Sequence, residues 1–308
     1  MGSSLVCSDA LTWLRGLPSG VAQCCVTSPP YYGLRDYGVT GQIGAEPSSA
    51  AFLDNLVAVF REMRRVLRDD GSLWLNLGDS YNAYNGNRGS SSGVNKRNQD
   101  VAPVLPPGFG LAEKALKNKD RMMIPARAAL ALQADGWWLR DEIVWHKPRA
   151  TPAPVIDRTV AAHEMVYVLT KKDRYFYDWA AIEEPASSAG RVVKGVRGSA
   201  GIVAGEDKKY GGREVVVRKT RRSRSVWSIS PQPYRDAHFA TMPPDLARRC
   251  VLAGSRPGSL VIDPFAGAGT TMLVAHQEGR EWAGCDLNPQ YVALAEARLM
   301  KEMLGGAA

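Results

Sequence analysis

The sequence predicts an α/β fold in which a mostly parallel sheet carries helices on both faces. Two short, almost wholly apolar runs, at 21–26 and 259–263, have the composition of strands buried in the middle of a parallel sheet. Segments with helical spacing of apolar residues alternate with such runs along the chain. A chain of 308 residues, 45% of them hydrophobic, is long enough for one large domain of this class with insertions.

The first 186 residues alternate between helical and strand-like patterns. The expected elements are a helix at 9–17, a strand at 21–26, a helix that begins at Ser48 or Ser49 and ends at 69–71, a strand at 72–77, a helix at 122–136, and strands at 137–145 and 161–170. Because strand, helix and strand follow one another over 21–77, the sheet is predicted to be parallel. Residues 82–110 are too polar to pack, and an idle surface loop and a binding lid are equally compatible with their composition.

A stiff loop follows the strand at 21–26. Its sequence is Thr27-Ser28-Pro29-Pro30-Tyr31-Tyr32. Neither proline can donate to a strand ladder, and each keeps the preceding residue out of a helix. Open parallel sheets bind their ligands at the carboxyl ends of strands, where this loop is expected to lie. Taken alone, the loop is equally compatible with a ligand site and with a proline turn whose tyrosines cover the sheet edge.

The last third of the chain contains a second loop of this kind. A strand at 259–263 ends in Asp263, and the glycine-rich sequence Asp263-Pro264-Phe265-Ala266-Gly267-Ala268-Gly269-Thr270-Thr271 leads into a predicted helix at 270–277. Glycine permits a sharp turn there, and the helix presents free N–H groups. A strand at 281–286 then ends in Asp286, placed to accept hydrogen bonds from a ribose diol, and a final helix starts at 288–289.

Three kinds of ligand compete for the glycine-rich loop. A dinucleotide would require the third glycine of G-x-G-x-x-G, which is absent, and a nucleoside triphosphate would require Gly-Lys-Ser/Thr, which is also absent. S-adenosylmethionine carries a ribose and an ammonium group but no phosphate. Asp263 would repel a pyrophosphate, whereas it can face an ammonium group directly or through water. The acid therefore favours S-adenosylmethionine.

The positive charge of the chain is concentrated in one insertion. Residues 187–224 contain eleven Lys and Arg against three acids, so this segment alone carries the net charge of +8 that the whole chain has. Such a local excess favours a polyanionic partner, although a solvated, disordered loop is the competing interpretation. The five cysteines and four histidines lack ligand or disulfide spacing, so neither a metal site nor a disulfide scaffold is expected. No membrane span or signal peptide is expected either, and a soluble, cytoplasmic protein is predicted.

The two loops together resemble the amino-methylating DNA methyltransferases. The resemblance rests on Thr27-Ser28-Pro29-Pro30-Tyr31, on Asp263-Pro264-Phe265-Ala266-Gly267-Ala268-Gly269-Thr270-Thr271, on His238-Phe239-Ala240-Thr241-Met242-Pro243 and on Gly284-Cys285-Asp286. The order of these segments along the chain is similar to the β-type order of that family: the catalytic loop comes first, the basic region next and the cofactor loop last. The resemblance implies a circularly permuted, Rossmann-like methyltransferase fold that uses S-adenosylmethionine to methylate cytosine N4 or adenine N6 in double-stranded DNA.

The resemblance also implies roles for particular residues. The catalytic set is Ser28, Pro29, Pro30 and Tyr31. The cofactor-binding set is Asp263, Pro264, Phe265, Ala266, Gly267, Gly269, Thr270, Thr271, Asp286, His238 and Ala240. The DNA-binding set comes from the charge pattern instead of the resemblance: Arg218, Lys219, Arg221, Arg222 and Arg224 in the basic insertion, and Arg35 beside the catalytic loop, for which a phosphate contact and a purely structural role are equally compatible.

The catalytic loop carries groups that suit methylation of an aromatic amine. The lone pair of such an amine is delocalised into the ring, and the Ser28 hydroxyl and Pro29 carbonyl can localise it by accepting its N–H groups. Direct in-line transfer is then expected, while Tyr31 stacks on a base that has been flipped out of the duplex. The family often has serine at the first position of this loop in cytosine-N4 enzymes, so Ser28 favours cytosine over adenine.

The expected organisation is one methyltransferase domain in two halves around an insertion. Residues 1–186, with a polar loop at 82–118, form the catalytic half, 187–224 the basic DNA-contact region, and 225–308 the cofactor half. A cognate restriction endonuclease is a partner that the resemblance allows, and monomer and homodimer both stay open. The rival classes are a nicotinamide oxidoreductase, a non-catalytic nucleic-acid binder, and a methyltransferase acting on RNA or protein amides.

Overall fold

The computed structural model describes residues 2–82, 113, 115–150, 153, 155–194, 214–232 and 241–305. The helices are α1 Ala10–Gly16, α2 Ser49–Val66, α3 Ile124–Ala134, the 3-10 helix η1 Ala180–Ile182, α4 Pro244–Gly254, α5 Thr270–Gln277 and α6 Pro289–Gly305. The strands are β1 Ser4–Cys7, β2 Ala22–Thr27, β3 Leu67–Leu77, β4 Trp138–His146, β5 His163–Thr170, β6 Glu184–Pro185, β7 Val192–Lys194, β8 Glu214–Val216, β9 Thr220–Arg221, β10 Val226–Ser228, β11 Leu260–Asp263 and β12 Glu281–Asp286.

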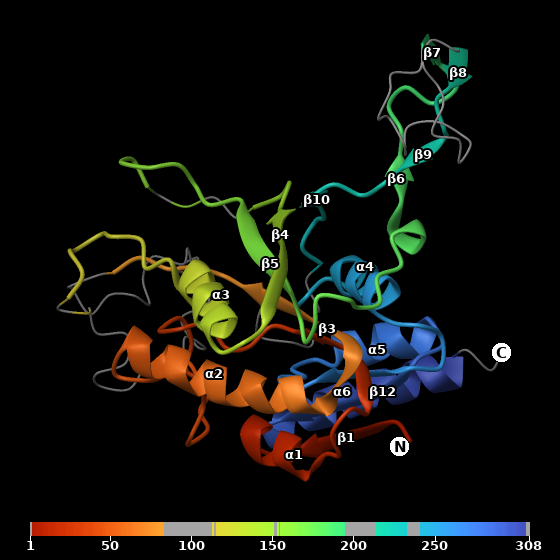
Figure 1. Cartoon of the computed structure of the whole chain (residues 1–308). Coiled ribbons are helices and arrows are strands. Elements are labelled where there is room, and N and C mark those ends of the chain that lie inside the picture. The colour runs from red at the N-terminus through yellow and green to blue at the C-terminus, as the bar shows by residue number, and fades with distance from the viewer. Residues whose placement is uncertain are drawn as a thin grey trace.

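An eight-stranded sheet forms the centre of the molecule, in the order β1-β12-β11-β2-β3-β5-β4-β10 (Figure 1). All neighbouring pairs are parallel except the two that involve β5, which runs antiparallel to both β3 and β4. The prediction of a mostly parallel sheet is confirmed. Strand β5 follows β4 through residues 147–162, and the described part of this connection contains no crossover helix that would return the chain to the other end of the sheet.

Two hydrophobic cores lie on opposite faces of this sheet. Helices α1, α2 and α3 pack on one face, where Phe52 and Phe60 are fully buried. Helices α4, α5 and α6 pack on the other face, where Trp74 and Trp227 are buried. Cys24 belongs to one core and Cys25 to the other, as expected for a central strand that is covered on both sides.

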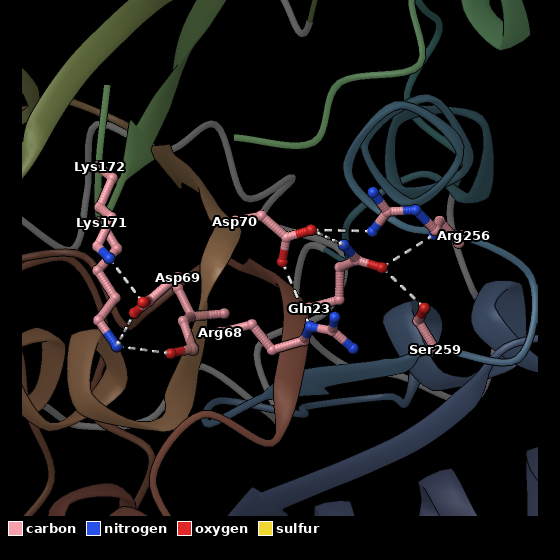
Figure 2. Close-up of polar contacts among 9 residues, drawn as sticks. Gln23, Arg68, Asp69, Asp70, Lys171, Lys172, Arg256 and Ser259 are labelled. Atoms are coloured by element: carbon pink, nitrogen blue, oxygen red, sulfur yellow. Dashed lines mark hydrogen bonds and ion pairs between the residues drawn. The ribbon is translucent and has the colours of Figure 1, made fainter. Parts of the chain in front are cut away.

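The predicted end of the second helix is wrong. Helix α2 begins with Ser48 as its N-cap, as expected, but it ends at Val66, and residues 69–71 belong to β3. The buried polar side chain of Gln23 explains why this acidic stretch is extended. Its Nε2 donates to Asp70 Oδ2 over 3.2 Å, and its Oε1 accepts from Ser259 Oγ over 2.8 Å (Figure 2).

Further ion pairs and close packing fix this end of the sheet. Arg256 reaches Asp70 at 3.0 Å, and Lys172 reaches Asp69 at 2.6 Å. A Cβ added at Gly71 would lie 3.0 Å from the carbonyl oxygens of Arg68 and Gln23, so the glycine permits two strands to approach closely. Gly71 therefore serves strand packing, and the ionic cluster joins β2, β3 and the start of β11 at their amino ends.

Several elements were not predicted from the sequence. Strand β1 adds a parallel edge next to β12, and α4 starts after Pro243 with Pro244 in its first turn. In and next to the basic insertion, the described residues form two small antiparallel sheets, β6 with β9 and β7 with β8. These sheets lie on an arm that projects from the main body (Figure 1).

Candidate functional site

The two loops singled out by the sequence lie side by side at the carboxyl ends of neighbouring strands. Strands β2 and β11 pair in parallel, with Cys24 opposite Val261 and Cys25 opposite Ile262. Where the two strands end, Thr27 Oγ1 donates to Asp263 Oδ1 over 2.6 Å. The hydroxyl of Thr271 donates to the carbonyl oxygen of Val26 over 3.0 Å, which ties the start of α5 to the same point.

A cavity of about 360 Å³ opens between these loops. This volume is within the range of pockets that hold small organic molecules. The predicted site residues that line the cavity are Ser28, Pro29, Pro30, Tyr31, Arg35, Asp263, Pro264, Phe265, Ala266, Gly267, Thr270, Thr271 and Asp286. Asn76, Trp145, Lys147 and Glu164 line it as well, although no motif in the sequence placed them there.

Asp286 is held in place by backbone N–H groups. Gly267 N–H donates to Oδ2 over 2.8 Å, and Asn288 N–H donates to Oδ1 over 2.9 Å. Each carboxylate oxygen therefore keeps acceptor capacity toward the cavity. Burial raises the pKa of Asp286, and the N–H groups of Asn288 and Gly267 partly oppose that rise. The geometry suits a ligand that offers two adjacent hydroxyl donors.

Asp263 is 4% exposed and lies beside the end of the catalytic-loop strand. Burial raises its pKa to about 6, against the opposing effects of hydrogen bonds from Thr27 and from the Phe265 N–H, 3.0 Å away. A carboxyl group of this kind is stabilised in its ionised form by a nearby cation. A ligand that brings a positive charge would supply it.

The glycine-rich loop has the conformation that its sequence predicts, with one change of interpretation. Gly267 and Gly269 have φ values of 50° and 73°, which favour glycine. A Cβ added at Gly269 would lie 2.9 Å from Ala295 Cβ. Gly269 does not line the cavity, and its missing side chain instead allows α6 to pack closely against the start of α5.

The hydroxyl of Tyr31 joins the catalytic loop to a polar cluster at the cavity wall. Tyr31 Oη donates to Glu164 Oε2 over 2.7 Å and accepts from Ser28 Oγ over 3.3 Å. Glu164 forms an ion pair with Lys147, and Asn76 Nδ2 donates to the same carboxylate over 3.2 Å. Burial, followed by the charge of Glu164, raises the pKa of Tyr31 well above its usual value, so the phenol keeps its proton.

Sequence reasoning did not assign a role to this cluster. Lys147 lies just after the strand predicted at 137–145, and Glu164 lies within the strand predicted at 161–170. A lone acid beside an apolar run, in Glu164-Met165-Val166-Tyr167-Val168, is the signal that could have marked it, since an acid in a buried strand requires a partner.

The predicted DNA-binding residues are divided between the cavity and the arm. Arg35 is exposed at the cavity, whereas the others lie on the arm that carries β9. Arg221 and Arg224 both donate to Glu184 Oε1, over 2.8 and 2.7 Å, and the Arg222 guanidinium lies 4.9 Å from the centre of the Trp179 ring. Arg218 and Lys219 are exposed.

Some expectations lie outside the described residues or concern absent features. His238, Ala240 and most of the polar loop at 82–118 are outside the described residues, although Thr241 and Met242, which directly follow Ala240, line the cavity. Among the residues described, no group of three or more His, Cys, Asp or Glu side chains is arranged to hold a metal. No helix in the described part of the chain is long and apolar enough to cross a membrane.

Comparison with known proteins gives a consistent result. A family model described as DNA methylase matches residues 22–297. The Type II methyltransferase M.XycI of Xanthomonas campestris pv. cyanopsidis is 47% identical over 301 residues, which cover 97% of this chain and 88% of that protein. The Type II methyltransferase M.Cfr9I of Citrobacter freundii is 44% identical over 301 residues, covering 98% and 89%.

Solved structures share the fold. PvuII DNA methyltransferase (cytosine-N4-specific) superposes with a TM-score of 0.65 at 18% identity, over 97% of this chain and 86% of that one. A putative DNA modification methylase from Thermus thermophilus, complexed with S-adenosyl-L-methionine, gives a TM-score of 0.57 at 25% identity, over 98% and 95%. The predicted fold class is confirmed, with the catalytic-loop strand preceding the cofactor-loop strand in the chain.

Proposed function

The chain belongs to the DNA methylase family, and we propose that it transfers a methyl group from S-adenosylmethionine to the exocyclic amino nitrogen N4 of cytosine in duplex DNA. One observation carries the proposal. The loops at 27–32 and 263–271 end adjacent parallel strands and line a single cavity. A methyl donor held by one loop and an amino group held by the other would meet there.

The residues of the cofactor half fit S-adenosylmethionine. Asp286 retains acceptor capacity on both oxygens for the two ribose hydroxyls, and Asp263 offers a buried carboxylate for the ammonium group. Phe265 and Tyr291 supply apolar surface in the same cavity for the adenine ring. When bound, the cofactor supplies an electrophilic methyl group on a positively charged sulfur.

The catalytic loop would hold the target amine. Ser28 Oγ and the carbonyl oxygen of Pro29 are the acceptors for its two N–H groups, and they draw the nitrogen toward the geometry in which its lone pair is localised. The consecutive prolines keep both acceptors in position, so little reorganisation is required as charge develops. No covalent attachment to the protein is needed.

Double-stranded DNA is the proposed macromolecular partner. The base must leave the duplex to enter the cavity, which costs roughly a few kcal/mol. Arg35 lines the cavity, where it would contact a phosphate near the flipped nucleotide. The basic arm around β9 would follow the backbone further along. Ser28 at the first position of the loop favours cytosine, whereas adenine N6 would use the same acceptors. A cognate restriction endonuclease stays a prediction.

Analysis of the product distinguishes these two bases. Duplex DNA is incubated with the protein and S-adenosylmethionine, then digested to nucleosides for mass spectrometry. N4-methylcytosine is expected, and N6-methyladenine alone would overturn the choice of base. Transfer to RNA or to protein amides without transfer to DNA would overturn the proposal itself.

The variant Ser28→Ala tests the mechanism. Its single-turnover rate is expected to fall far more than its affinity for cofactor or DNA, because the lost acceptor acts on the reacting nitrogen. A rate that survives while binding collapses would assign Ser28 to binding instead. Methylation-sensitive sequencing of DNA from cells that express the chain then gives the target site.

A further inference from the structure

The Ser28 hydroxyl has to accept a hydrogen bond from the target amine, and this requirement rests on the function proposed above. A hydroxyl group can donate as well as accept, and it has only one proton. If Ser28 pointed that proton at the amine, two donors would face each other and the lone pair of nitrogen would not be localised. The surroundings of Ser28 must therefore direct its proton elsewhere.

A chain of hydrogen bonds leads the Ser28 proton away from the cavity. Ser28 Oγ–H donates to Tyr31 Oη over 3.3 Å, and Tyr31 Oη–H donates in turn to Glu164 Oε2 over 2.7 Å. A carboxylate can only accept, so Glu164 determines the direction of both bonds. Tyr31 also lies 3.3 Å from Asn76 Oδ1, but this contact is longer than its bond to Glu164.

Lys147 supplies a second donor to Glu164. The two side chains form an ion pair and are 21% and 17% exposed, and the Lys147 ammonium also lies 4.3 Å from the centre of the Trp145 ring. Asn76 Nδ2 donates to Glu164 Oε2, so every neighbour of the carboxylate in this cluster is a donor. The carboxylate therefore faces Lys147, Asn76 and Tyr31 as a common acceptor.

We propose that Glu164 and Lys147 are positioning residues that set the direction of the hydrogen bonds from Ser28 through Tyr31, so that the lone pairs of Ser28 Oγ face the target amine. In this role both residues act through Tyr31 and Ser28. They act by fixing where the protons of two hydroxyl groups point, and the phenol ring of Tyr31 is held in one orientation as a result. A Cβ added at Gly78 would lie 2.5 Å from Tyr31 Cε2, so the ring is confined from that side too.

The variant Glu164→Gln tests this proposal with almost no change in shape. Lys147 requires an acceptor, so the amide oxygen is held toward Lys147 and the amide NH₂ faces Tyr31 Oη. The hydrogen bonds between residue 164, Tyr31 and Ser28 then run in the opposite direction. Tyr31 donates to Ser28, and the Ser28 proton is left to point at the target amine. The single-turnover rate is expected to fall about ten- to a hundredfold, the scale seen when groups that orient reactive residues are lost. Affinities for S-adenosylmethionine and for DNA should stay unchanged.

Two combined variants separate this role from a merely structural one. In Lys147→Met with Glu164→Gln, the amide is free to turn its oxygen toward Tyr31, so the double variant should be faster than Glu164→Gln alone. In Tyr31→Phe the hydroxyl that links Ser28 to Glu164 is already missing, so adding Glu164→Gln to this variant should change the rate no further. A fully additive cycle, or no recovery with Lys147→Met, would overturn the proposal.

A matched control and a direct measurement complete the test. Glu278 is also ion-paired and 25% exposed, but lies outside the cavity, so Glu278→Gln should leave the rate unchanged. Neutron crystallography of the unmodified protein should place the Ser28 deuteron toward Tyr31 and the Tyr31 deuteron toward Glu164. Either deuteron pointing the other way would refute the proposal. If the deuterons lie as expected but no amino group is methylated, the proposed function has failed and the hydrogen-bond direction stands.

Discussion

Asp263 shows how a single residue can be unfavourable for the ligand-free protein and favourable for binding. Its carboxyl is buried at the end of β11, and burial raises its pKa from 3.8 to about 6. The ionised form that predominates above pH 6 is therefore stabilised less in the folded protein than in the unfolded chain. A bound ammonium group would compensate for that cost. The stability of the free protein and its affinity for the cofactor are thus opposed at this position.

We expect Asp263→Asn to stabilise the ligand-free protein and to weaken S-adenosylmethionine binding. Because the folded pKa is the higher one, the contribution of Asp263 to stability is present below pH 3.8 and is lost as the pH rises to about 6. The advantage of the variant should therefore grow over that interval to about 3 kcal/mol and stay level above it. Denaturant unfolding at a series of pH values measures this. An advantage that shrinks with rising pH would contradict the assignment.

Asp286→Ala is expected to weaken S-adenosylmethionine binding by about 1.5–3 kcal/mol, the range for hydrogen bonds that involve a charged group. Titration calorimetry measures the loss directly. The carboxylate also holds the N–H groups of Gly267 and Asn288, so unfolding curves are needed alongside to show that the loop is intact. Equal affinities for the variant and the parent protein would remove Asp286 from the cofactor site.

At the scale of elements, the start of α5 depends on close packing against α6. Gly269 has a φ of 73°, and a Cβ added there would lie 2.9 Å from Ala295 Cβ. Gly279 has a φ of 71°, but a Cβ added there would have nothing within 4 Å. The two glycines therefore share the backbone constraint, and only Gly269 has the packing constraint. This pair allows the two effects to be measured separately.

Gly279→Ala should cost about 1–2 kcal/mol of unfolding free energy, the strain of a left-handed backbone for a residue with a side chain. Gly269→Ala should cost more, by about 1–3 kcal/mol, because α5 and α6 must move apart. The displacement should also shift Gly267 and thereby lower cofactor affinity in Gly269→Ala alone. Thermal unfolding and calorimetry of both variants provide the comparison. Equal losses of stability would show that packing against α6 contributes nothing.

At the scale of the whole molecule, β9 and the basic residues that flank it lie on a projecting arm (Figure 1). They belong to the segment 187–224, whose net charge of +8 equals that of the whole chain. The ion pairs of Arg221 and Arg224 with Glu184 order two of these arginines on the arm while leaving their side chains 36% and 67% exposed. A preordered cationic surface loses less side-chain entropy when it meets a phosphate backbone. The arm is therefore suited to bind DNA at a distance from the cavity.

Replacing Arg221, Arg222 and Arg224 with alanine should reduce the salt dependence of DNA binding. Each phosphate contact contributes a slope of about −0.9 to log affinity against log salt, so the slope should become shallower by about 2 to 3. Relaxed sequence preference would show that some of these arginines contact bases. Cofactor affinity should not change, since the arm is separate from Asp286 and the glycine-rich loop.

A matched control removes the same charge elsewhere. Arg15, Arg68 and Lys172 are exposed cations at the opposite end of the sheet from the cavity, so their triple alanine variant should leave the slope unchanged. Filter binding at several salt concentrations compares the two variants. Identical slopes in the arm variant and the parent protein would indicate that the arm does not contact DNA.

The sequence by itself determined the local structure and the two loops. Periodicity predicted α5 and β12 at their observed bounds, because the burial pattern of a short element depends on the residue types within that element. It also predicted that the loop at Ser28 would follow one strand and that Asp263 would end another. It was wrong about 69–71, where an acid and a glycine that are typical of a helix end are held in a strand by Gln23 and Arg256, which lie far away in the chain.

Only the tertiary structure decided which strand ends are neighbours. The contact between Thr27 and Asp263 joins residues separated by 236 positions, and the contact of Tyr31 with Glu164 joins residues separated by 133. The order of strands in a sheet is set by how all the helices and strands pack together, and no local pattern records it. For this reason the two loops could be predicted from the sequence, while the cluster of Glu164, Lys147 and Asn76 behind Tyr31 could not.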